Sequence, residues 1–81
     1  MISDANMSGF VKALGWEYMA GVGGDFLTHE TFGVIMIEPS GSARHWRNGH
    51  IENSFTIDMG AGMKPAITHA ILTIEGKEDG I

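Results

Sequence analysis

The chain has 81 residues, of which 43% are hydrophobic and 19% charged, and its ten acidic and five basic side chains give a net charge of −5. This composition is typical of one small folded domain, and the acidic balance argues against broad binding to nucleic acid or to anionic membranes. The sequence has no cysteine, which excludes disulfides, cysteine–zinc sites and thiol catalysis.

The first predicted element is an amphipathic helix over about residues 4–19. Apolar residues recur with the three- and four-residue spacing of one helix face: Met7, Phe10, Val11, Leu14 and Tyr18. Gly15 offers an earlier end for this helix, because glycine adopts the left-handed conformation after a helix at no steric cost. Residues 20–25 are rich in glycine, and we interpret them as a linker.

The rest of the chain predicts about four antiparallel strands. The expected strands cover residues 31–38, 43–47, 50–58 and 66–75. Asn48-Gly49 is the strongest local signal, because both residues of a two-residue type I′ turn need positive φ. We therefore predict an α+β fold with one N-terminal helix on a roughly four-stranded antiparallel sheet. A small closed barrel, or a barrel completed by a second subunit, is the alternative arrangement.

The turn at Asn48-Gly49 also sets a register for the hairpin that it closes. The predicted cross-strand pairs are Arg47 with His50, Trp46 with Ile51, His45 with Glu52, and Arg44 with Asn53. Successive side chains of a strand point to opposite faces of the sheet. The side chains predicted to face the core are Trp46, Ile51, Phe55 and Ile57. Those predicted to face solvent are His45, Arg47, His50 and Glu52.

Two of the predicted strands, residues 31–38 and 66–75, are apolar in both of their alternating sets of side chains. Strands of this kind are usually buried on both faces. One helix covers only one face of a sheet, and both strands would be edges in a simple meander. We therefore expect either that the last strand pairs with the first or that a second copy of the chain covers them. A homo-oligomer is the favoured interpretation.

The predicted hairpin also holds the densest group of chemically versatile side chains: Arg44, His45, Trp46, Arg47, His50 and Glu52. No acidic residue occurs from residue 39 to residue 51, so this acidic protein concentrates positive charge beside an aromatic ring. Arginine suits carboxylate and phosphate groups, and tryptophan and arginine are enriched at binding hot spots. These residues are predicted to bind a protein partner or a small anionic ligand.

The residues of the hairpin also fit three other interpretations. His45, His50 and Glu52 resemble an open zinc ligand set, but Arg47 on the same predicted face repels a cation. Two histidines near an arginine suit acid–base cleavage of a phosphodiester, but the predicted surface is flat. The third interpretation is a merely solvated polar face with weak cross-strand ion pairs. We therefore predict no metal site, no cofactor and no enzymatic activity.

The expected function is non-enzymatic binding through surface contacts. No apolar run is long enough to span a membrane, and the N-terminus lacks the pattern of a signal peptide, so we expect a cytoplasmic protein without membrane contact. In size, acidity and lack of cysteine the chain resembles the small proteins of phages and mobile elements, and we expect an accessory protein of this type that inhibits a host enzyme or sequesters a phosphate-bearing ligand. The alternatives are a structural subunit of a viral or other homo-oligomeric assembly, and a small histidine-dependent phosphoesterase.

Overall fold

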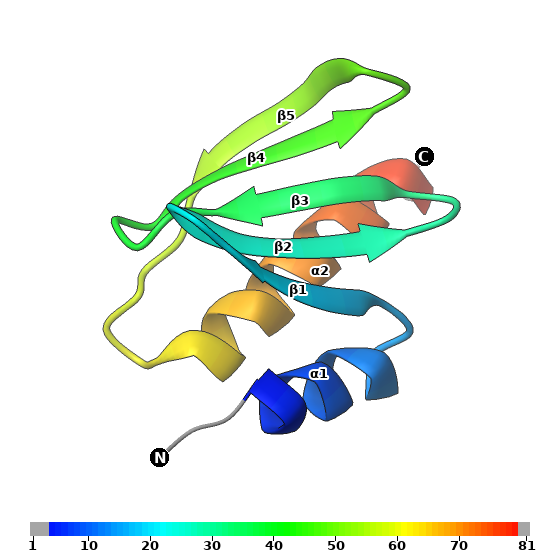
Figure 1. Cartoon of the computed structure of the whole chain (residues 1–81). Helices are drawn as coiled ribbons and strands as arrows, with labels where there is room; N and C mark the ends of the chain where they lie inside the picture. The colour runs from blue at the N-terminus through cyan, green and yellow to red at the C-terminus, as the bar shows by residue number, and fades with distance from the viewer. Residues whose placement is uncertain (1–3, 80–81) are drawn as a thin grey trace.

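The computed structural model describes residues 4–79 of the chain. The elements in chain order are α1 (Asp4–Ala13), β1 (Glu17–Gly21), β2 (Gly24–His29), β3 (Gly33–Ile37), β4 (Ser42–Arg47), β5 (His50–Thr56) and α2 (Met63–Asp79). The strands form one antiparallel sheet in the order β1-β2-β3-β4-β5 (Figure 1). The predicted α+β class with an N-terminal helix is confirmed. The sheet has five strands and is open, so the closed-barrel alternative is wrong.

Helix α1 is shorter than the predicted helix and ends at the earlier of its two candidate stops. Gly15 has a φ of 92°, and the amide of Trp16 donates to the carbonyl of Val11 at 3.2 Å, which closes the end of the helix. The residues that follow enter β1. The glycine-rich segment that we predicted as a linker is the turn of a hairpin, in which Gly21 pairs with Gly24. This hairpin supplies the two strands that the sequence prediction missed.

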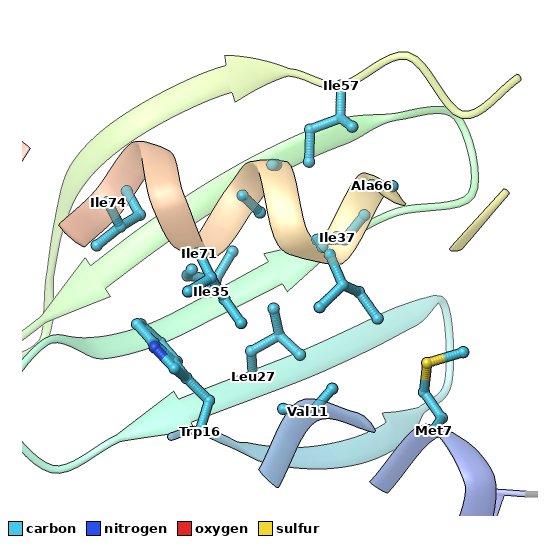
Figure 2. Close-up of a cluster of buried hydrophobic side chains, with 13 residues drawn as sticks. Met7, Val11, Trp16, Leu27, Ile35, Ile37, Ile57, Ala66, Ile71 and Ile74 are labelled. Atoms are coloured by element: carbon cyan, nitrogen blue, oxygen red, sulfur yellow. The ribbon is translucent and has the colours of Figure 1, made fainter. Parts of the chain in front are cut away.

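The prediction of a last strand at residues 66–75 is wrong, because this segment lies within α2. Its buried side chains recur at intervals of three and four residues: Ala66, Ile67, Ala70, Ile71 and Ile74. Figure 2 labels Ala66, Ile71 and Ile74 along this helix. The β-branched composition favoured a strand, but intrinsic propensity is weak beside the burial of a continuous apolar stripe. Pro65 lies in the first turn, where a missing N–H breaks no helical hydrogen bond. The apolar segment is therefore buried by one helix face.

The core lies between the two helices and one face of the sheet, which we call the inner face. Strand side chains at its centre are Leu27, Ile35 and Ile37 (Figure 2), and Ala43 belongs to the same cluster. Helix α2 crosses this face, and α1 lies beside β1 at one edge of the sheet (Figure 1). The opposite face, which we call the outer face, is covered by no element within residues 4–79. The fold is therefore a two-layer arrangement in which the sheet has one protected and one open side.

Candidate functional site

The β4–β5 hairpin begins as predicted and then departs from the predicted register. Asn48 and Gly49 have φ values of 54° and 82°, Arg47 pairs with His50, and Trp46 pairs with Ile51. Between Trp46 and His45 the register shifts by one residue. Glu52 is passed over, so that His45 pairs with Asn53 and Arg44 with Ser54. This irregularity is a β-bulge, which inserts one extra residue into β5.

The bulge and the pairing of β4 with β3 reverse part of the predicted face assignment. His45 stands opposite the buried Ile35 and is itself 0% exposed on the inner face. Trp46 and Ile51, predicted to be buried, are 37% and 51% exposed on the outer face. Phe55 packs against the core as predicted, because the extra residue returns the end of β5 to the predicted orientation. The prediction failed because an ungapped hairpin register cannot anticipate a bulge.

His45 is held in the core by two hydrogen bonds. Its Nε2 lies 2.5 Å from the carbonyl oxygen of Phe32, and because a carbonyl only accepts, Nε2 carries the hydrogen. The side-chain amide of Asn53 donates to Nδ1 at 3.0 Å. Both ring nitrogens are therefore occupied inside the protein, as is usual for a buried polar group. In this conformation His45 cannot contact a ligand at the surface.

The other predicted site residues are divided between two places. Arg44 lies on the outer face with Trp46, and its guanidinium donates to the carboxylate of Glu38 at 3.1 Å. Arg47 and His50 form a cross-strand pair at the end of the hairpin. Glu52 is exposed at the bulge. Within residues 4–79, no group of three or more histidine, aspartate or glutamate side chains is placed to hold a metal ion.

Strand pairing aligns the side chains of the outer face in rows across the sheet. One row consists of Glu17, Thr28, Val34, Trp46 and Ile51, and the next consists of Met19, Phe26, Met36, Arg44 and Ser54. Six of these side chains are apolar, and we call them the apolar patch: Met19, Phe26, Val34, Met36, Trp46 and Ile51. The patch spans all five strands and is bordered by polar side chains. Sequence reasoning did not identify this surface.

Parts of the apolar patch left a signal in the sequence. Val34 and Met36 are the second apolar set of a strand that we recognised as apolar on both sides. Met19, which is 60% exposed, lies in the segment that we predicted as a helix, and Phe26 directly follows the predicted linker. The strand-like alternation of Met19 with Tyr18, and of Phe26 with Leu27, was therefore missed. Recognising the glycine-rich turn as a hairpin would have placed both on one face.

A shallow depression of about 730 Å³ lies beside the Val34 end of the patch. Its lining residues are Gly15, Glu17, Thr28, His29, Glu30, Thr31, Gly33 and Val34. The ring of His29 is fixed between Trp16 and Phe32, at centroid distances of 5.0 and 4.7 Å. Its Nδ1 accepts a hydrogen bond from the backbone amide of Thr31 at 3.0 Å. The depression therefore has a rigid wall and adjoins the apolar patch.

Comparisons of this chain with models of protein families, with curated protein sequences and with solved structures find no match. Neither helix of the described chain combines the length and the apolar character needed to cross a membrane. We therefore infer function from the surfaces and contacts of the chain itself.

Proposed function

We propose that this chain is a non-enzymatic binding protein whose contact surface is the outer face of the sheet. The observation that carries the proposal is the apolar patch, which is continuous across five strands and covered by no described element. Contiguous apolar surface rimmed by polar residues marks interaction sites, whereas single exposed apolar side chains do not. A protein partner that covers this patch removes its apolar surface from water, and this transfer contributes favourably to the free energy of binding.

The composition of the outer face supports a protein as the partner. Trp46 and Arg44, two residues of the predicted hairpin site, lie two positions apart on β4 and share this face. Tryptophan and arginine are the side chains most often found at binding hot spots. Met19 and Met36 add flexible, polarizable surface that adapts to a partner. We therefore propose that these two hairpin residues act within the outer face.

Charge on the outer face argues against a small anion as the ligand. The guanidinium of Arg44 is already engaged by Glu38, so an anionic ligand would have to displace a carboxylate of the same chain. Glu17 adds a second negative charge to this face. His45 is buried and both of its ring nitrogens are engaged within the chain, so it gives no support to acid–base chemistry shared with His50. We propose that the contact is mainly apolar and that it is made in the cytoplasm, where a protein without cysteine needs no oxidising environment.

Site-specific photo-crosslinking tests this surface even while the partner is unidentified. A benzophenone amino acid replaces Met36 in one variant and Leu72 in another; Leu72 is 61% exposed on α2, away from the outer face. After irradiation in the expressing cells, we expect discrete cross-linked products from position 36 and none from position 72. Mass spectrometry then identifies the captured chain. No product from position 36, or the same products from both positions, would contradict the proposal.

A further inference from the structure

We propose that the partner of the apolar patch is a second copy of this chain. The two copies pack with their outer faces together, so that two sheets form the centre of a helix–sheet–sheet–helix dimer. Two sheets in contact lie about 10 Å apart, and their inner side chains interdigitate as in a β-sandwich. This inference rests on the proposed function, because it names the partner of the same face.

The distribution of charge favours a second copy at this face. The chain carries a net charge of −5, so two copies repel each other through most of their surface. Strand alternation places Glu17, Glu38 and Arg44 on the outer face, and the last two form an ion pair within one chain. Glu52 is exposed at the bulge on the edge strand β5, away from the centre of this face. Two outer faces can therefore meet with little like-charge repulsion. The centre of the outer face is therefore apolar and carries little net charge.

The area of the face sets the expected strength of the dimer. A third outward row follows the two already described and contains Gly21, Gly24, Ser42 and Thr56. Five strands at about 4.8 Å spacing and these three rows at about 7 Å spacing give a footprint on the order of 500 Å² per copy. Two copies then bury about 1,000 Å² or somewhat more, which is near the lower limit for a specific interface. We therefore expect a reversible dimer with a dissociation constant in the micromolar range.

Met36 lies at the centre of the face, in the middle strand and in the middle row. A two-fold axis between two packed faces lies in the plane of the interface, and such an interface is isologous. When the axis passes through the centre of the face, Met36 meets Met36 of the second copy, whatever the direction of the axis. A charge at position 36 is therefore brought against an identical charge.

The depression gives a reason to prefer an axis along β3. That axis places each row over the same row of the second copy and reverses the order of the strands. Trp46 on β4 then lies over Thr28 on β2 of the second copy, at the margin of the depression. In this arrangement the ring of Trp46 fills part of the depression on the second copy, which removes more of the ring from water.

Opposite charges at position 36 test the dimer. Sedimentation velocity of the unmodified chain, from micromolar to submillimolar concentration, should show a monomer–dimer equilibrium. Met36→Glu and Met36→Lys should each weaken the dimer by about 100-fold or more, because like charges would meet at a desolvated centre. An equimolar mixture of the two variants should form a one-to-one heterodimer. Leu72→Glu, the matched control on α2, should dimerise as the unmodified chain does.

The outcomes separate this inference from the proposed function. If the chain stays monomeric while position 36 cross-links a different protein, the second copy is refuted and the binding surface stands. If the chain dimerises but neither charge at position 36 matters, the dimer uses another surface and the inference is wrong. Circular dichroism checks that each variant is folded. If the variants at position 36 are not folded, Ile51→Glu on the edge strand replaces them, and an undiminished dimer in that variant overturns the inference.

Discussion

Replacing Trp16 with alanine should lower the free energy of unfolding by about 3–5 kcal/mol, the range for truncating a large buried aromatic side chain. Trp16 is 1% exposed and lies between α1 and β1. Its ring stacks on Phe32 at 5.9 Å, and its Nε1 donates to the carboxylate of Glu75 on α2 at 3.0 Å. Small domains have only about 5–15 kcal/mol of stability, so this loss removes a large share of the total and should lower the midpoint of thermal unfolding markedly.

The second tryptophan provides a matched control for this substitution. Trp46→Ala removes the same side chain from the outer face, where it is 37% exposed, and should cost less than about 1 kcal/mol in a monomeric sample. Urea unfolding followed by circular dichroism, at concentrations too low for association, measures both values. Equal losses from the two substitutions would show that the two rings do not differ in burial as described.

The sequence was sufficient for the features that depend on local chemistry. The turn at Asn48-Gly49 was predictable because few residues tolerate its backbone angles, and the first two pairs of the hairpin followed from it. Gly15 was recognised as a helix stop for a similar reason. The bulge at Glu52 was not predictable, because it is fixed by the match of β4 to the buried residues of β3. One unpredicted residue was enough to move Trp46 to the surface and His45 into the core.

The candidate surface was harder to predict than the class of fold, because it depends on which elements are neighbours. Val34 and Met36 were recognised as a second apolar set, but the partner that we assigned to them was the segment at residues 66–75. The apolar residues of that segment fit the three-to-four residue period of a helix, and its β-branched composition fits a strand equally well. Only tertiary packing decides between helix and strand here. Once it is a helix on the inner face, the outer face lacks a covering layer within the described chain. The apolar patch is exposed because this segment packs on the inner face as a helix.

His45→Leu should lower the free energy of unfolding by about 2–4 kcal/mol, although leucine is apolar and of similar size. The substitution leaves the carbonyl of Phe32 and the amide of Asn53 without the partners that they have inside the protein. An unsatisfied buried polar group costs about 1–3 kcal/mol, which exceeds the gain from a more apolar side chain.

A second substitution at position 45 isolates the contribution of the hydrogen bond to Phe32. The side-chain amide of glutamine can occupy the place of the imidazole Nε2 and donate to the same carbonyl, so His45→Gln should cost about 1 kcal/mol less than His45→Leu. Asn53 is partly exposed, and water can satisfy its amide in either variant, so the difference reports mainly on the Phe32 carbonyl. Urea unfolding of the two variants gives the comparison directly. A glutamine variant no more stable than the leucine variant would mean that His45 stabilises the fold by packing rather than by its hydrogen bond to the turn before β3.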